Sequence, residues 1–374
     1  MNADIQQLHG SELREAIRYW LLQTDVRQLA ALWATADQVR REHVGDAIYL
    51  RGIIEISNRC IRRCAYCGIN ASNHRISRYT MTMDEIVECA CTIEKAGCGT
   101  VVLQSGEDWT LTPLWIADTI REIKKRTSLA VTLSLGERLP EELRQWRETG
   151  ADRYLLKIET SDKVLYDRIH PPRGKEAPNR FEILNQLRRL GYETGSGIMI
   201  GIPGQTIDIL TEDIITLAGL DVDMAGSGPF IAHRHTPLAG YDDAIKPDGQ
   251  AGNDALTTYK VNALLRILCP QMNLPTTTAL STISARNGRA LGLQRGANVI
   301  MPNFTPLPYR QCYEIYPRQT GGNNSKEDIL HVIKKTVHSI GRYVASNRGD
   351  FVQYQLRRHN NPKRGEGVHD YAAV

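Results

Sequence analysis

The chain has 374 residues, of which 41% are hydrophobic and 24% charged, and this composition is typical of a folded globular protein. The net charge of +4 is too small to predict binding to nucleic acid, and no apolar run is long enough to predict a membrane span. The N-terminus lacks the basic and apolar regions of a signal peptide, so we expect a cytoplasmic protein.

Residues 1–47 predict an N-terminal helical extension, because Leu13, Ile17, Trp20 and Leu21 recur at helical intervals. From residue 48 to about residue 320, strand-like and helix-like segments alternate. The expected strands are 48–57, 100–104, 129–135, 153–159, 193–200, 224–230, 275–280 and 297–301.

The expected helices between them are 82–97, 112–126, 140–148, 178–190, 206–219, 254–269 and 286–295. The first begins with a capping box, Thr82 to Glu85, and ends at Gly97. Eight strands alternating with helices predict an α/β fold, a (β/α)8 TIM-type barrel. Residues 321–374 predict a short C-terminal helix (328–346) and a polar, solvated tail.

Three cysteines follow the first expected strand with the spacing C-x3-C-x2-C: Cys60, Cys64 and Cys67. Three thiolates on one short loop are suited to holding three irons of a 4Fe–4S cluster. Nothing nearby is an obvious fourth protein ligand, so one iron would be open to a small chelating molecule, which points to S-adenosylmethionine. The alternatives are a zinc site closed by His74, or unligated core thiols.

The remaining cysteines have spacings that suggest no disulfide framework, although a second cluster on the first three is an alternative; they are Cys89, Cys91, Cys98, Cys269 and Cys312. The first three lie in or just after an expected helix. We therefore expect them to pack in the core of a protein in a reducing compartment.

In such a barrel, functional residues lie at the C-terminal ends of the strands. Ser105, Gly106 and Glu107 follow the second strand and offer backbone groups and a carboxylate for the ammonium of a methionine moiety; a solvated turn is the alternative. Glu159 ends the fourth strand, where its carboxylate would accept both hydroxyls of a ribose. Arg180 opens the next helix and would clamp a carboxylate, unless it forms a surface ion pair.

Later segments add further candidates. The glycines between Gly195 and Gly204 would allow a flat adenine to approach the backbone beside Ile200. His233 and His235 predict loop hydrogen bonds more readily than a metal site. Three tyrosines spaced like one helical face either pack on the barrel rim or line a substrate pocket; they are Tyr309, Tyr313 and Tyr316.

Together these residues resemble the radical S-adenosylmethionine (radical SAM) superfamily and, within it, the HydE family of FeFe-hydrogenase maturases. The resemblance runs from about residue 48 to about residue 318, and the cysteine motif alone identifies only the superfamily. The longer matching strings are residues 49–58, 103–108, 131–137, 150–156, 191–195 and 297–303.

The resemblance implies one 4Fe–4S cluster on Cys60, Cys64 and Cys67, which cleaves S-adenosylmethionine to methionine and a 5′-deoxyadenosyl radical. It implies an organometallic iron substrate in assembly of the hydrogenase diiron centre (H-cluster), an electron donor such as ferredoxin or flavodoxin, and other hydrogenase maturases as partners. It implies cosubstrate contacts from Tyr66, Ser105, Gly106, Glu107, Ser134, Glu159, Arg180 and Ile200. It implies a substrate cavity lined by Thr132, Thr277, Thr278, Met301 and Arg310, with Lys157, Tyr313 and Tyr316 as catalytic or orienting residues.

Two departures from the family pattern are present. The family string at strand four is Leu-Leu-Arg-x-Glu, whereas this chain has Lys157, which keeps the charge but loses the planar fork of arginine. No cysteine follows Pro317, so we expect no accessory cluster. The alternative functions are a methylornithine-synthase-like mutase, a biotin-synthase-like enzyme, or a scaffold that binds an iron precursor without turnover.

Overall fold

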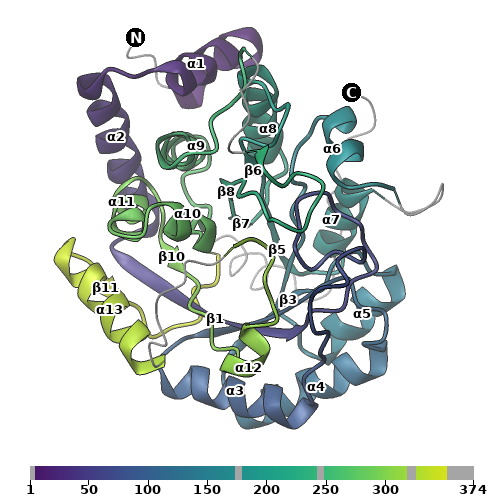
Figure 1. Cartoon of the computed structure of the whole chain (residues 1–374). Helices are drawn as coiled ribbons and strands as arrows, with labels where there is room; N and C mark the ends of the chain where they lie inside the picture. The colour runs from purple at the N-terminus through teal and green to yellow at the C-terminus, as the bar shows by residue number, and fades with distance from the viewer. Residues whose placement is uncertain (1–4, 173–178, 242–247, 318–325, 352–374) are drawn as a thin grey trace.

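The computed structural model describes residues 5–172, 179–241, 248–317 and 326–351. A parallel sheet in the order β7-β5-β4-β3-β2-β1-β10-β9 forms the centre of the fold (Figure 1). Its edge strands meet, because Ala225 N donates to Asn273 O at 3.0 Å and Asn273 N donates to Asp223 O at 3.0 Å. The expected barrel is therefore confirmed. Its strands are β1 (Ala47–Ser57), β2 (Thr100–Ser105), β3 (Ala130–Ser134), β4 (Arg153–Leu155), β5 (Glu193–Ser196), β7 (Met224–Ala225), β9 (Pro275–Thr276) and β10 (Val299–Ile300).

Helices cover the outside of the barrel. They are α3 (Met83–Lys95), α4 (Pro113–Arg126), α5 (Pro140–Thr149), α6 (Lys163–Ile169), α7 (Arg180–Arg189), α8 (Ile207–Gly219), α9 (Ala255–Leu268), α10 (Thr278–Ile283), α11 (Gly288–Gln294), α12 (Leu307–Arg310) and α13 (Lys326–Ser339). After the short 3-10 helix η1 (Ile5–Gln7), helices α1 (Gly10–Leu22) and α2 (Val26–Val44) pack beside α8 and α9 (Figure 1). Among the described residues, no helix has the length and apolar character to cross a membrane.

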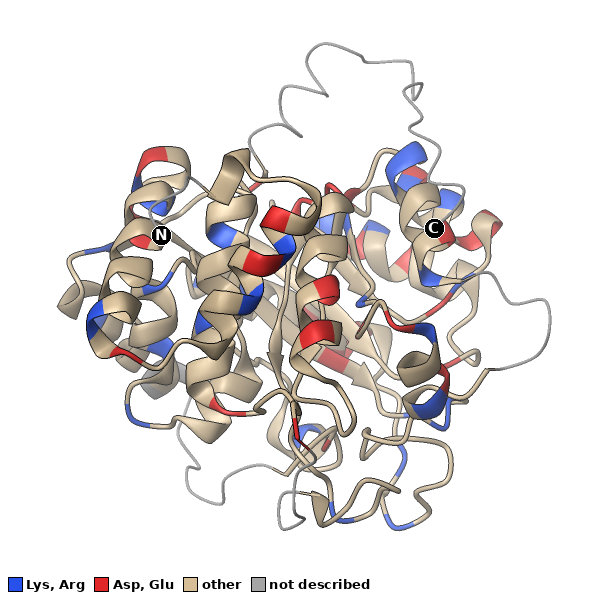
Figure 2. Ribbon diagram, turned by 90° about the horizontal axis from the view of Figure 1, so that it is seen from above, with Lys and Arg blue, Asp and Glu red and all other residues tan. Residues whose placement is uncertain are grey.

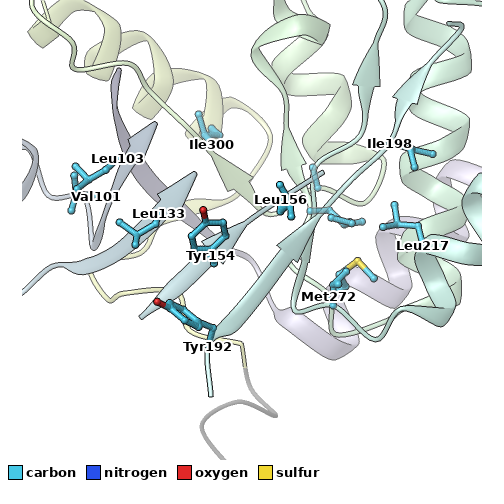
Figure 3. Packing of buried hydrophobic residues seen from close by; sticks show 14 of the residues in the cluster. Val101, Leu103, Leu133, Tyr154, Leu156, Tyr192, Ile198, Leu217, Met272 and Ile300 are labelled. Atoms are coloured by element: carbon cyan, nitrogen blue, oxygen red, sulfur yellow. The ribbon is translucent and has the colours of Figure 1, made fainter. Parts of the chain in front are cut away.

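Alternation along the strands separates the core from the barrel interior. Val101, Leu103 and Leu133 are fully buried and belong to one hydrophobic cluster with the surrounding helices (Figure 3). Successive side chains of a strand face opposite sides. Gln104, next to Leu103, and Thr132, next to Leu133, therefore face the barrel interior. The polar residues expected at the site therefore lie on the inner face.

The C-terminal segment closes the N-terminal end of the barrel. Strand β11 (Tyr343–Val344) pairs with β1, and the chain then turns under the barrel. Gly349 O accepts from Arg51 Nη2 at 3.1 Å, and Arg153 forms an ion pair with Asp350. This leaves the C-terminal ends of the strands as the accessible end.

Three expected strands are interrupted. The strand expected at 153–159 is regular only as β4, which ends at Leu155, and Glu159 then forms an isolated bridge with Ile198. The other two are those expected at 193–200 and 224–230. β6 (Met199–Ile200) and β8 (Gly228–Pro229) form a separate parallel pair beyond β5 and β7. At the break the two segments of the chain approach closely, because a Cβ on Gly197 would lie 2.0 Å from Gly226 O. The expected strand at 275–280 is wrong beyond Thr276, because the Thr277 side chain accepts from Leu280 N and caps α10 instead.

The expected helical face of tyrosines is also wrong. α12 ends at Arg310, and Tyr309 packs outside the barrel, where its hydroxyl donates to Glu85 Oε1 at 2.7 Å. Tyr313 instead turns inward and is buried. The C-terminal helix, expected to reach residue 346, ends at Ser339 before the positive φ of Gly341. The predicted polar tail lies outside the described residues.

Candidate functional site

The cysteine loop is held by hydrogen bonds to its own backbone. Arg78 donates to four carbonyl oxygens of the loop: Asn58 at 2.5 Å, Ile69 at 2.7 Å, Asn70 at 2.7 Å and Asn73 at 3.1 Å. The loop thus wraps around the Arg78 guanidinium, which holds its conformation although the loop contains no helix or strand. The thiols are thereby presented at the end of β1.

The three thiols lie close together. Burial, opposed by the charge of Arg180 and reinforced by the neighbouring Cys60, raises the pKa of the Cys64 thiol to about 12. Burial and then repulsion from Cys64 and Cys60 raise the pKa of Cys67 as well. Buried thiols that repel one another as thiolates are matched to a cationic cofactor, which favours the deprotonated form. The donor set therefore fits an iron–sulfur cluster.

The zinc alternative has no support. Within the described ranges, no three His, Cys, Asp or Glu side chains are grouped to hold a single metal ion, which includes the surroundings of His74. A single zinc needs all its sulfur ligands at about 2.3 Å, whereas a cluster takes one thiolate for each of three irons. Cys89 and Cys98 pack in the core as expected. His233 forms a loop hydrogen bond, accepting from His235 N at 3.1 Å through Nδ1.

The turn after β2 lies directly against the cysteine loop. A Cβ on Gly106 would be 2.3 Å from Arg59 O and 2.8 Å from Cys60 Cβ, so the contact requires glycine. The Ser105 hydroxyl donates to Gly106 O at 2.5 Å. Glu107 is buried, and its Oε2 accepts from Glu137 N at 3.1 Å. The structure thus brings the predicted Ser105–Gly106–Glu107 turn to the cluster loop.

Glu159 stands at the centre of a polar group in the loop that follows β4. Its Oε1 accepts from the Tyr66 hydroxyl at 3.3 Å and lies 3.9 Å from Arg180 Nη1. Its Oε2 lies 2.9 Å from Lys157 Nζ. Glu159 has a φ of 64°, a conformation that non-glycine residues rarely adopt. The structure therefore brings three predicted residues, Tyr66, Lys157 and Arg180, together around one buried carboxylate.

A buried histidine contacts two arginines beside this carboxylate, and no local sequence pattern marks it. His170 Nε2 lies 2.7 Å from Arg180 Nη2, and its Nδ1 lies 2.7 Å from Arg62 Nη2. Burial, followed by the charges of Arg180 and Arg62, lowers the pKa of His170 to about 2. Arg180 also donates to Glu137 Oε1 at 3.0 Å. The guanidinium of Arg180 is consequently fixed in direction.

The glycine segment after β5 lies against Glu159, because Met199 N donates to Glu159 O at 2.8 Å. Ile200 is fully buried, and Gly201 has a φ of 75°. The Gln205 side chain accepts from Gly201 N at 2.6 Å. Gln205 was missed from the sequence, where nothing distinguishes it from a helix-entry residue.

The substrate-side candidates have different surroundings. Thr132 faces the interior, and its buried hydroxyl has no hydrogen-bond partner within the described part of the chain. Buried Tyr313 accepts from Gln104 Nε2 at 3.2 Å through its hydroxyl. Thr278 is exposed in the first turn of α10. Half-buried positions are held by Ser134, Thr277, Met301, Arg310 and Tyr316.

Comparison with known proteins identifies the class. The model of the radical SAM superfamily matches residues 54–215, the part of the barrel that carries the cysteine loop, Glu159 and Arg180. The chain belongs to this superfamily and is an enzyme that uses a 4Fe–4S cluster and S-adenosylmethionine.

The relatives within the superfamily are more specific. The chain is 45% identical to the FeFe hydrogenase maturase subunit HydE of Thermotoga maritima over 329 residues, which cover 88% of this chain and 91% of that one. It is 28% identical to 3-methylornithine synthase of Methanosarcina barkeri, over 88% and 89% of the two chains. The solved structure of methylornithine synthase (PylB) matches with a TM-score of 0.78 at 24% identity, over 94% of this chain and 98% of that one.

Proposed function

We propose that this chain is a HydE-type maturase that acts in assembly of the FeFe-hydrogenase diiron centre. The observation that carries the proposal is 45% identity to HydE across 91% of that protein. The site adds physical support, because three mutually repelling thiols lie at the barrel mouth beside a buried carboxylate.

Cys60, Cys64 and Cys67 would hold three irons of the cluster. When bound and reduced, the cluster supplies the electron that cleaves S-adenosylmethionine to methionine and a 5′-deoxyadenosyl radical. The thiols are half-buried or buried, and the turn at Gly106 packs against them. The protein thereby limits access of water to the reacting atoms.

The cosubstrate would lie between the ends of strands two, four and five. Glu159 would accept the ribose hydroxyls, and Arg180, fixed by Glu137 and His170, would pair with the methionine carboxylate. Backbone and side-chain oxygens of the β2 turn would take the ammonium group. The remaining proposed contacts are Tyr66, Ser105, Gly106, Glu107, Ser134 and Ile200.

The organometallic iron substrate would occupy the barrel interior below the cosubstrate. The unpartnered hydroxyl of Thr132 supports this placement, because a buried polar atom without a partner is costly unless a ligand satisfies it. Lys157, Tyr313 and Tyr316 would orient the substrate. The proposed lining residues are Thr132, Thr277, Thr278, Met301 and Arg310.

The proposed partners are a one-electron donor such as ferredoxin or flavodoxin, and the other hydrogenase maturases. The proposed compartment is the cytoplasm, because a reduced cluster requires a reducing environment.

The test is reconstitution of hydrogenase activity. A host that makes an FeFe hydrogenase and the other maturases, but no HydE, is supplied with this chain. We expect active hydrogenase, together with 5′-deoxyadenosine release by the purified, reduced protein that depends on an iron–cysteine carbonyl cyanide precursor. Inactive hydrogenase alongside normal production of folded, iron-loaded protein would overturn the proposal.

A second candidate function is amino-acid mutase chemistry, favoured by the full-length likeness to methylornithine synthase. The same purified protein is offered free amino acids in place of the iron precursor. Release of 5′-deoxyadenosine and formation of 3-methylornithine from an amino acid alone would select the mutase.

A further inference from the structure

Asp213, on α8, is a fully buried carboxylate outside the site described above. It accepts from the Thr160 hydroxyl at 2.9 Å, the Ser161 hydroxyl at 2.6 Å, the Ser161 backbone N–H, and Gln205 Nε2 at 2.7 Å. An ionised carboxylate is an acceptor only, so four donors can converge on it without conflict. These donors come from two loops at the ends of strands four and five.

The first loop carries Glu159. Its φ of 64° is unfavourable for a residue with a Cβ, and such a conformation persists only when neighbouring contacts hold it. Thr160 and Ser161 follow immediately, and both are bound by Asp213. Asp213 thereby fixes the chain on the C-terminal side of the strained residue.

The second loop carries the glycine turn. Gln205 Oε1 accepts from Gly201 N at 2.6 Å, while its Nε2 donates to Met199 O at 3.0 Å and to Asp213. A carboxylate can face only the NH2 of this amide, so Asp213 sets which way the Gln205 side chain points. That orientation secures the turn that follows Ile200.

We propose that Asp213 is a positioning residue for the adenosyl group of S-adenosylmethionine, holding the Glu159 carboxylate and the Ile200–Gly201 backbone at a fixed separation. This inference rests on the proposed roles of Glu159 and Ile200. Asp213 is not one of the residues proposed to contact the cosubstrate or the cluster. It acts through Thr160, Ser161 and Gln205.

The primary test is Asp213→Asn in the reconstituted holoenzyme. The variant has nearly the same shape but turns an NH2 toward at least one of the four donors. We expect normal iron content and a roughly 10-fold weaker equilibrium binding of S-adenosylmethionine to the unreduced protein, equivalent to loss of about one hydrogen bond. KM for S-adenosylmethionine rises by a similar factor, while kcat at saturation changes little.

Matched variants separate positioning from general stability. Thr160→Val removes one donor to Asp213 and weakens cosubstrate binding, whereas Thr160→Ser keeps the hydroxyl and restores it. Asp208→Asn, on the exposed face of the same helix, leaves binding unchanged. Faster amide exchange at residues 159–161 and 201 in Asp213→Asn is the structural signature. Should Asp213→Asn fail to fold, the two Thr160 variants decide.

The outcomes distinguish this inference from the function on which it rests. If Glu159→Gln weakens cosubstrate binding but neither Asp213→Asn nor Thr160→Val does, Asp213 is only structural and the inference is overturned. If none of the three weakens binding, the proposed adenosine site itself is wrong. The inference is supported if Asp213→Asn, Glu159→Gln and Thr160→Val each weaken cosubstrate binding. In that case Thr160→Ser, which keeps the hydroxyl, binds the cosubstrate normally.

Discussion

Lys157 and Glu159 form an ion pair in the loop that follows β4, with Lys157 Nζ 2.9 Å from Glu159 Oε2. The two side chains are two residues apart and face the same side. The lysine that departs from the HydE-family pattern is therefore engaged with the carboxylate proposed to bind ribose. An arginine in its place would offer a planar fork with several donors, whereas the lysine offers one compact charge.

Replacing Lys157 tests whether its ion pair with Glu159 supports binding of S-adenosylmethionine. Lys157→Met leaves Glu159 with Tyr66 and Arg180 only, and we expect KM for S-adenosylmethionine to rise about 5-fold, the equivalent of about 1 kcal/mol for a partly exposed pair. Lys157→Arg, which keeps the charge, restores that KM. The measurement is 5′-deoxyadenosine release at varied cosubstrate concentration. An unchanged KM in Lys157→Met would show that the ion pair does not support cosubstrate binding.

The cluster assignment is tested through one buried thiol. Cys64→Ala removes one of three proposed iron ligands, and we expect loss of most bound iron and sulfide and no detectable 5′-deoxyadenosine. Cys89→Ala is the matched control, because Cys89 is an equally buried thiol in the helical core. Iron content and visible absorption of anaerobically reconstituted protein are measured. Full turnover by Cys64→Ala would contradict the assignment.

The buried His170 predicts a pH dependence of stability. Its ring faces Arg62, Arg180, Glu137 and Tyr166, and its pKa falls from 6.5 to about 2 in the folded chain. Between these values the unfolded chain binds the extra proton. The free energy of unfolding therefore falls as the pH drops below 6.5, by about 1.4 kcal/mol per pH unit from this group.

The measurement is chemical denaturation of wild type and His170→Gln between pH 7.5 and pH 5. Glutamine does not titrate, so the variant loses this contribution and its stability declines less steeply. The comparison uses slopes rather than absolute stability, because the substitution also changes packing. Parallel slopes in the two proteins would refute the depressed pKa.

The sequence predicts best what depends on neighbours along the chain. The capping box at Thr82 is local, and its prediction is confirmed. The thiols of the C-x3-C-x2-C loop are local as well, and in the structure they influence one another's ionisation. Asp213 and His170 bind partners up to 53 and 108 residues away, and no local pattern marks such contacts. Thr276 and Thr277 look alike in a β-prone run, but only the fold shows that the second caps a helix.

The last prediction concerns the close contact between the β2 turn and the cysteine loop. In Gly106→Ala, the new Cβ would lie 2.3 Å from Arg59 O and 2.8 Å from Cys60 Cβ. The obstruction is backbone rather than a flexible side-chain end, so the loop itself must move. We expect loss of about 1–3 kcal/mol of stability, as for other overpacked positions, and a lower iron content after reconstitution.

Gly219→Ala is the matched control for this substitution. Its Cβ meets nothing within 4 Å, and the residue lies in α8 without a positive φ. Alanine there gains helix propensity, so stability is unchanged or rises by up to about 1 kcal/mol. Thermal unfolding and iron content are measured for both variants. If Gly106→Ala matched Gly219→Ala in both, the cysteine loop would not depend on close approach of the β2 turn, and the proposed ammonium contacts at that turn would lose their structural basis.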